Sequence, residues 1–198
     1  MKIIFIGFMA AGKSFFSKRL AERLNMERID MDGMVLRQSG RASVSEIFEK
    51  DGETKFRELE IATAKSFGKK DNVIIDSGGG VVLNKIILDY LRIDGVVVFL
   101  DSPLAVIEKR LKGDKARPLW QDKERFRRLY KLRLSLYREY SDVMVKTGSS
   151  LFFSADGKSH KMTPAAEKIL ELIIKKIKPA LSVKAPNKGS HIKRKNKI

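Results

Sequence analysis

The chain has 198 residues, enough for one domain with a sizeable core, and its 43% hydrophobic and 33% charged composition is typical of a globular protein. The absence of cysteine excludes disulfide bonds and cysteine-ligated metals. No membrane-length apolar run and no charged leader with an apolar segment are apparent, so we expect a cytoplasmic protein. The net charge of +17 is high, and nucleic-acid binding is one interpretation of it. Because the charge is spread along the chain without a recognisable module, we expect a monomeric enzyme for anionic small molecules, without nucleic-acid or membrane partners.

A glycine-rich stretch near the start carries the first functional signal. The apolar residues 3–6 predict a buried strand, residues 13–24 predict a helix, and Gly7 to Ser14 between them read GFMAAGKS. Glycines at this spacing let backbone N–H groups converge on a phosphate at a helix N-terminus. Lys13 can reach the β- and γ-phosphates, and the Ser14 hydroxyl can ligate Mg²⁺. The stretch therefore predicts a P-loop that binds a nucleoside triphosphate.

Strands and helices alternate along the rest of the chain. Further strands are expected at 28–29, 73–75, 96–100 and 142–146, with helices at 33–48 (broken by a turn at 39–41), 53–67, 84–91, 103–111, 122–140 and 164–177. We interpret 113–121 as a loop, 148–161 as an irregular insertion and the residues from 178 as a flexible tail. This order predicts a mainly parallel sheet with helices on both faces and ligands at the carboxyl ends of its strands.

Two acidic residues follow the second strand. They are Asp30 and Asp32, of which one can hold Mg²⁺ through water and the other can accept a proton from an attacking hydroxyl. The structural alternative is a turn and a helix N-cap, which Asp32 can serve. After a P-loop, the functional interpretation is favoured.

Four further features bear on the site around the phosphates and the acceptor. Arg57 lies mid-helix among apolar residues and can bind a carboxylate in bidentate fashion, although a solvated arginine is the usual alternative. Gly78 to Gly80 follow a buried strand and permit close backbone approach to a ligand. Asp76 is either a metal ligand or a loop-stabilising residue, and both interpretations stay open. Arg117 lies in a loop that can close over the phosphates and exclude water.

Together these motifs resemble the shikimate kinase family of nucleoside-monophosphate-kinase-like P-loop proteins, over roughly residues 3–146. The matching motifs are Gly7-Phe8-Met9-x-x-Gly12-Lys13-Ser14, Asp30-x-Asp32, Ile47-Phe48-x-x-x-Gly52-Glu53-x-x-Phe56-Arg57-x-x-Glu60, Gly78-Gly79-Gly80, Arg117-Pro118-Leu119 and Arg133-x-x-Leu136-Tyr137.

The resemblance implies an α/β fold of three layers, with a five-stranded parallel sheet of order 2-3-1-4-5. It implies transfer of the ATP γ-phosphate to the 3-hydroxyl of shikimate, with Mg²⁺, in aromatic amino acid biosynthesis. The implied catalytic residues are Lys13, Asp32 and Arg117. Shikimate would be held by Asp32, Arg57, Gly78, Gly79, Gly80 and Arg133, and Mg²⁺ by Ser14 and Asp30. The nucleotide would be held by Gly7, Ala10, Ala11, Gly12, Lys13, Ser14, Phe15, Arg110, Arg117 and Pro164.

The implied organisation is a kinase domain at 1–178, with a substrate-binding subdomain at 33–62 and a lid at 113–124, followed by a basic flexible tail at 179–198. The chain departs from the family pattern at Ala10, where glycine is usual, at Asp76, and at Trp120, where an aliphatic residue is usual. Rival functions are a related kinase for gluconate or a nucleoside monophosphate, and a GTPase. The GTPase is disfavoured because Asn84-Lys85-Ile86-Ile87 lacks the aspartate of a guanine-binding motif.

Overall fold

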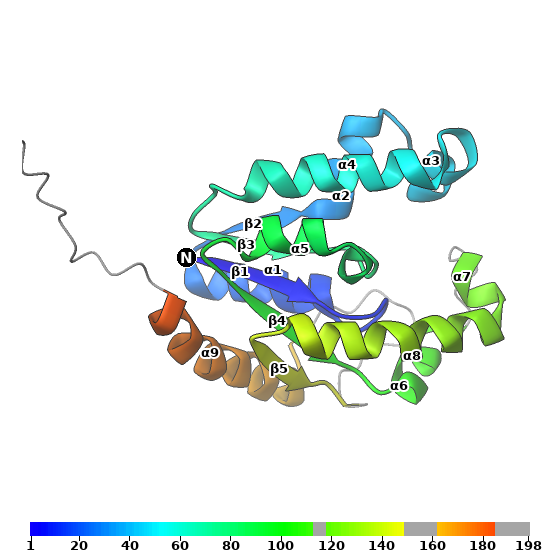
Figure 1. Ribbon diagram of the computed structural model, residues 1–198. Helices are drawn as coiled ribbons and strands as arrows, with labels where there is room; N and C mark the ends of the chain where they lie inside the picture. Colours follow the sequence, from blue (N-terminus) through cyan, green and yellow to red (C-terminus); the bar gives the residue numbers. More distant parts are fainter. Residues whose placement is uncertain (113–117, 149–161, 185–198) are drawn as a thin grey trace, which may run out of the picture.

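The computed structural model describes residues 1–112, 118–148 and 162–184 (Figure 1). Its strands are β1 (Lys2–Ile6), β2 (Glu27–Asp30), β3 (Val73–Asp76), β4 (Gly95–Asp101) and β5 (Val143–Lys146). Its helices are α1 (Lys13–Leu24), α2 (Met31–Ser39), α3 (Val44–Lys50), α4 (Gly52–Phe67), the short 3₁₀ helix η1 (Val81–Leu83), α5 (Lys85–Arg92), α6 (Leu104–Leu111), α7 (Pro118–Gln121), α8 (Lys123–Tyr140) and α9 (Pro164–Lys184).

All four strand pairings are parallel, and the order β2-β3-β1-β4-β5 confirms the predicted sheet. Because β1 lies at the centre, the loop that follows it emerges between the ends of β3 and β4. This is the point at which ligands bind to open parallel sheets. Helices α4 and α8 extend past these strand ends on either side of β1 (Figure 1).

Alternating residues of β1 divide the core into two layers. Ile4 and Ile6 face a cluster with buried residues of α4, α5, α6 and α8. Ile3 and Phe5 face a second cluster with buried residues of α1 and α9. The sheet is therefore covered on both faces, as its continuously apolar strands require.

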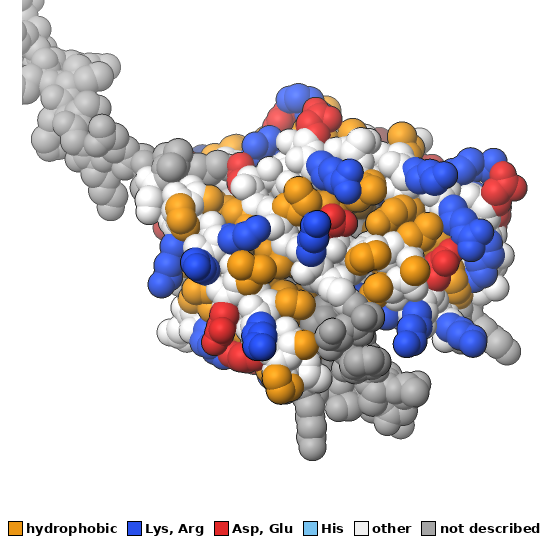
Figure 2. All heavy atoms as spheres, turned by 90° about the horizontal axis from the view of Figure 1, so that it is seen from below, with side chains coloured by type: hydrophobic (Ala, Val, Ile, Leu, Met, Phe, Trp, Pro, Cys, Tyr) orange, Lys and Arg blue, Asp and Glu red, His pale blue; other side chains and the backbone are white. Residues whose placement is uncertain are grey.

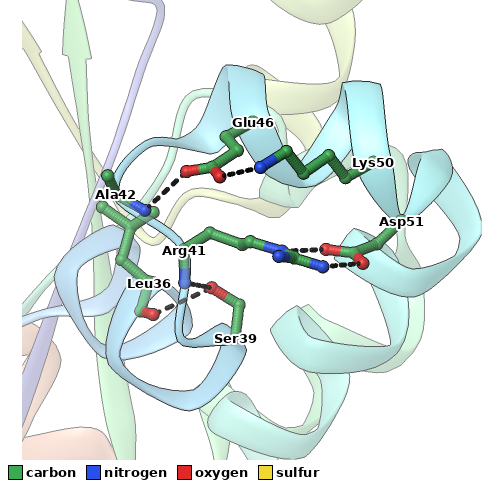
Figure 3. Close-up of polar contacts among 7 residues, drawn as sticks. All are labelled: Leu36, Ser39, Arg41, Ala42, Glu46, Lys50 and Asp51. Atoms are coloured by element: carbon green, nitrogen blue, oxygen red, sulfur yellow. Dashed lines mark hydrogen bonds and ion pairs between the residues drawn. The ribbon is translucent and has the colours of Figure 1, made fainter.

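A small separate core joins α2, α3 and α4, where Val35, Ile47 and Phe56 pack together. Polar contacts reinforce this unit (Figure 3). The Arg41 guanidinium donates two hydrogen bonds to the Asp51 carboxylate, at 2.9 and 2.7 Å. These contacts hold α2, α3 and α4 together as a unit with a core separate from that of the main sheet.

Side-chain hydrogen bonds cap the start of α3. The Ser43 hydroxyl accepts from the Glu46 backbone N–H at 3.1 Å. The Glu46 carboxylate accepts from Ala42, one residue before the cap, and from Lys50 one turn later (Figure 3). Together these contacts fix the entry of the chain into α3.

Two segments differ from expectation. Residues 118–121 form the short helix α7 within the predicted loop. Helix α9 continues to Lys184 instead of ending near residue 177, although Pro179 removes one backbone donor. The face of α9 that includes the buried Ile177 continues beyond Pro179 to the partly buried Ala180. None of the helices in the described ranges is long and apolar enough to span a membrane.

Lys2 joins the central strand to the end of α4. Its buried Nζ donates to the carbonyl oxygens of Phe67 and Gly68, at 3.0 and 3.1 Å. The Phe67 carbonyl also accepts from the Lys70 backbone N–H at 3.1 Å, so Lys2 is its second donor. A cation at this place complements the helix dipole.

We expect Lys2→Met to lower the free energy of unfolding by about 1–3 kcal/mol, because the buried Gly68 carbonyl loses its side-chain donor while the Phe67 carbonyl keeps only the Lys70 N–H. Urea denaturation measures the change. Lys18→Met, on the exposed face of α1, is the matched control, with an expected change within about 0.5 kcal/mol. Equal stability of the two variants would contradict the role of Lys2.

Candidate active site

The P-loop turns sharply at its two glycines. Gly7 has φ of 148°, and a Cβ there would lie 2.9 Å from the Leu100 carbonyl oxygen of β4. Gly12 has φ of 103° and precedes the first residue of α1. Both positions therefore require glycine, the first for space as well as for its backbone angles. The predicted succession of strand, glycine-containing loop and helix is confirmed.

The side chain of Lys13 lies against the inside of the loop. Its Nζ donates to the carbonyl oxygens of Gly7 and Phe8, at 3.0 and 3.2 Å. Ser14, in the first turn of α1, is exposed to solvent. Phe15 packs edge-on against Phe16 and against the α1–α9 core layer, so its ring anchors the helix.

The nucleotide candidates outside the P-loop lie beside β4 and β5. Arg110, on α6, donates to the Ala10 carbonyl at 2.7 Å and to the Gly148 carbonyl at 3.2 Å. Pro164 is the exposed first residue of α9. Arg117 lies outside the described residues, as do the start of the predicted lid and all of the insertion but residue 148.

The two aspartates after β2 have different local roles. Asp30, rather than Asp32, caps α2, since its carboxylate accepts from the Gly33 backbone N–H at 3.1 Å. The N-cap alternative that we considered for Asp32 is therefore wrong, because the helix begins at Met31. Both carboxylates are exposed at the carboxyl edge of the sheet.

Each glycine of the triple-glycine loop makes room for a different part of the site. A Cβ on Gly78 would lie 2.5 Å from Asp32 Oδ1. On Gly79 it would lie 3.5 Å from the Gly7 carbonyl oxygen, and on Gly80 3.2 Å from an Arg57 nitrogen. The loop thus contacts Asp32, the P-loop and Arg57 in turn, and brings these sequence-distant candidates together.

Arg57 reaches this loop from α4 as part of an ion pair. It donates to Glu60 at 2.6 Å and to Glu53 at 3.0 Å. The Glu60 side chain is only 2% exposed. Burial raises the pKa of Glu60, Asp32 adds to that rise, and the cations Arg57 and Arg133 oppose it. Glu60 is therefore the buried acidic partner of Arg57, and its charge also attracts Arg133.

Arg133 approaches from α8 and is only 8% exposed. One guanidinium nitrogen donates to the Gly79 carbonyl at 3.4 Å, while its buried Nε has no hydrogen-bond partner among the described residues. Burial lowers the pKa of Arg133, as expected for a desolvated cation. A buried donor left unsatisfied is costly and suits a bound anion.

Asp76 points to the α1 side of the sheet. Its carboxylate accepts from Arg28 of β2 at 2.5 Å, and Arg28 Nε donates to the Ser17 hydroxyl of α1 at 2.9 Å. The structure therefore places Asp76 in a buried ion pair that ties β2, β3 and α1 together.

A family model described as shikimate kinase matches residues 9–178 of this chain. The chain belongs to the shikimate kinase family. Members of this family are ATP-dependent phosphotransferases of the shikimate pathway, and the sheet order is that of the shikimate kinase fold.

Individual shikimate kinases agree with this assignment. The shikimate kinase of Caldicellulosiruptor bescii is 41% identical over 139 residues, which cover 69% of this chain and 80% of that one. The structure of the Acinetobacter baumannii shikimate kinase in complex with shikimate is similar with a TM-score of 0.72 and 32% identity, covering 88% of this chain and 93% of that one. The structure of the Aquifex aeolicus shikimate kinase is similar with a TM-score of 0.72 and 32% identity, covering 91% of this chain and 98% of that one.

Sequence reasoning missed two buried residues that shape the candidate site. Glu60 was part of a quoted motif, and its spacing of three from Arg57 was the available signal for an ion pair. The Tyr137 hydroxyl donates to the Gly79 carbonyl at 2.5 Å, and burial raises the pKa of Tyr137. Tyr137 lies one turn after Arg133, so the same face of α8 supplies both donors to this carbonyl.

The departure at Trp120 is accommodated by aromatic packing. The Trp120 ring lies edge-on to Phe126 with centroids 5.1 Å apart. Phe126 in turn lies 5.1 Å from Phe8 of the P-loop. The larger side chain therefore adds to the contacts between the α7–α8 segment and the P-loop.

The two arginines of the site have opposite expected effects on stability without ligand. Arg133→Met removes a buried cation with an unpaired donor, so we expect the free energy of unfolding to rise by about 1 kcal/mol. Arg57→Met leaves the Glu60 carboxylate buried without its partner, so we expect a fall of about 2 kcal/mol. Urea denaturation measures both.

The effect of Arg57→Met should also depend on pH. Because the folded-state pKa of Glu60 is raised, its contribution to stability is present in acid and is lost as the pH rises through that pKa. The deficit should therefore be smallest in acid. Arg128→Met, in an exposed pair with Glu124, is the control and should change little. Destabilisation of similar size by Arg57→Met and Arg133→Met, independent of pH, would contradict this account.

Proposed function

We propose that this chain transfers the γ-phosphate of ATP to the 3-hydroxyl of shikimate, giving shikimate 3-phosphate and ADP. The observation that carries the proposal is the convergence of Arg57 and the incompletely paired Arg133 on the triple-glycine loop, next to the P-loop. Two guanidinium groups suit a carboxylate, and glycines beside them leave room for a small hydroxylated ring.

The donor half of the proposed site is the P-loop. Backbone N–H groups from Ala10 to Phe15 and the N-terminus of α1 suit the phosphates of ATP. Lys13 would exchange its contacts with the loop carbonyls for the β- and γ-phosphate oxygens. Arg110 and Pro164 would flank the adenine, and Arg117, outside the described residues, would complete the cations around the transferring group.

The acceptor half lies between the α2–α4 unit and α8. Arg57 and Arg133 would bind the shikimate carboxylate, while Gly78 to Gly80 would lie along its ring. Residues 33–62 would then act as the substrate-binding subdomain. Because every proposed site residue belongs to one chain, a monomer suffices for activity.

Ser14 and Asp30 would hold Mg²⁺, Ser14 directly and Asp30 through water. No group of three or more metal-binding side chains occurs among the described residues. This fits Mg²⁺, which commonly uses few protein ligands and takes the rest from water and phosphate. Bound there, the ion would neutralise charge on the β- and γ-phosphates.

In the proposed reaction the 3-hydroxyl oxygen attacks the γ-phosphorus. A new O–P bond forms, and the bond from phosphorus to the β–γ bridging oxygen breaks, releasing ADP. Asp32 would accept the hydroxyl proton, since its exposed carboxylate lies beside Gly78 at the acceptor side. Lys13 would stabilise the negative charge that develops on the transferring phosphoryl group.

Related kinases that phosphorylate gluconate or a nucleoside monophosphate are the alternative. A gluconate carboxylate would also suit the two arginines, whereas a nucleoside monophosphate would bring a larger ring system to a loop that closely contacts Asp32 and Arg57. The distribution of the basic side chains does not favour nucleic acid as a substrate. On the face in Figure 2, Lys and Arg side chains are spread among hydrophobic and acidic ones.

A coupled ADP-release assay with shikimate, gluconate and nucleoside monophosphates side by side tests the proposal. We expect turnover with shikimate alone. Lys13→Met should reduce kcat by at least about a hundredfold, because transition-state charge loses a cation, whereas Lys18→Met should not. Turnover with gluconate or a nucleotide but not shikimate would overturn the proposal, and near-normal kcat in Lys13→Met would remove Lys13 from catalysis.

Gly78→Ala and Gly80→Ala test the spatial role of the glycine loop. A Cβ on Gly78 must displace the short Asp32 side chain, so we expect kcat to fall about tenfold or more. A Cβ on Gly80 meets the end of the flexible Arg57 side chain, so the main expected effect is a higher KM for shikimate. Steady-state kinetics separate the two, and wild-type kcat in Gly78→Ala would contradict the proposed place of Asp32.

A further inference from the structure

The P-loop contains an alanine in a backbone conformation that favours glycine. Ala10 has φ of 57°, in the left-handed region. It is the third residue of a turn closed by a hydrogen bond from the Ala11 N–H to the Phe8 carbonyl, at 3.2 Å. Glycine is preferred at positive φ in such turns, because a Cβ there crowds the backbone. The loop shape at Ala10 must therefore be held by contacts outside the turn.

Those contacts come from Arg110 and Ser102. An Arg110 guanidinium nitrogen donates to the Ala10 carbonyl at 2.7 Å and to the Ser102 hydroxyl at 3.3 Å. The Ser102 hydroxyl lies 3.4 Å from the Ala11 carbonyl, to which it donates. Two consecutive carbonyls of the P-loop are thus fixed on the side occupied by β4 and α6.

This pair is itself anchored in the core. Ser102 is buried and shares a short hydroxyl contact with the fully buried Thr147 at the end of β5. The Tyr130 hydroxyl donates to the Ser102 carbonyl at 3.0 Å. The second Arg110 nitrogen binds the Gly148 carbonyl. Burial lowers the pKa of Arg110, so its charge is kept in place at a cost that these acceptors offset.

We propose that Arg110 is a positioning residue for the P-loop: it holds the left-handed turn at Ala10 in the shape that receives the triphosphate. The inference rests on the proposed function and extends it, since the resemblance assigns Arg110 only to the adenine. A peptide plane turns as a unit, so fixing the carbonyls of Ala10 and Ala11 also fixes the N–H groups that follow them. Binding of the triphosphate by the P-loop then depends on Arg110, the arginine that the resemblance assigns to the adenine.

Inorganic tripolyphosphate separates the two roles because it has phosphates and no base. Isothermal titration measures its binding, and that of ATP, to the wild-type chain and to Arg110→Ala. We expect Arg110→Ala to weaken tripolyphosphate binding by about tenfold, as well as ATP binding. Arg127→Ala is the control, since it removes an arginine that pairs with Glu108 on the surface and should leave both affinities unchanged.

Ala10→Gly supplies a readout that a general structural defect would not give. Glycine adopts the left-handed conformation without a brace, so Arg110→Ala should cost much less tripolyphosphate affinity in the Ala10→Gly background than alone. Arg110→Lys, which retains a cationic donor, should restore part of the affinity and keeps the test open if Arg110→Ala folds poorly.

Two results would overturn the inference. One is unchanged tripolyphosphate binding in Arg110→Ala and Arg110→Lys while ATP binding falls, which would limit Arg110 to the base. The other is an equal loss with and without Ala10→Gly. Failure of the wild-type chain to bind tripolyphosphate or ATP would overturn the proposed function together with this inference, whereas a loss confined to Arg110 variants supports the inference.

Discussion

The close contact between the triple-glycine loop and the P-loop is the constraint on which the site depends. A Cβ on Gly79 would lie 3.5 Å from both the Gly7 carbonyl oxygen and the Met9 nitrogen, so the two backbones are neighbours separated by little more than the space of a methyl group. The approach follows from the sheet, because β1 and β3 are neighbours and end together. The proposed donor and acceptor halves would therefore meet along these two backbone segments, which suits direct transfer between two bound substrates.

Charge balance is the second constraint, and it is incomplete in the ligand-free chain. Glu60 compensates Arg57, while Arg133 is buried with an unpaired Nε. A folded protein keeps such a group only when packing elsewhere offsets its cost, and cores are least optimised where they bind ligands. Here the offset comes from α8, whose Phe126 and Tyr137 are fully packed on either side of Arg133. A carboxylate ligand would complete the balance.

Much of the fold and of the candidate site could be predicted because both follow from local patterns. Apolar strands that alternate with helices predicted the parallel sheet, and the spacing from Gly7 to Ser14 predicted the turn into α1. The order 2-3-1-4-5, which came from the family resemblance, is confirmed. Local spacing pointed to Asp32 as a possible cap of the next helix, whereas Asp30 takes this role because the backbone after β2 begins α2 at Met31.

Properties that depend on contacts between distant residues were not predictable. The partner of Asp76 is Arg28, 48 residues earlier, and the pairing follows from the register of β2 and β3. The burial of Arg133 requires the position of α8 against the glycine loop. The brace from Arg110 to Ala10 spans 100 residues. In each case the sequence indicated a charged residue of interest, while its partner depended on the tertiary structure.

The central claim is that the P-loop and the acceptor loop hold both substrates together, so that the phosphoryl group passes directly between them. The stereochemistry at phosphorus tests this most directly. With ATP made chiral at the γ-phosphorus by oxygen isotopes, one direct in-line transfer to shikimate inverts the configuration, and the account predicts inversion in the shikimate 3-phosphate formed. Retention of configuration would mean that a protein side chain carries the phosphoryl group between two separate steps, and would contradict the account.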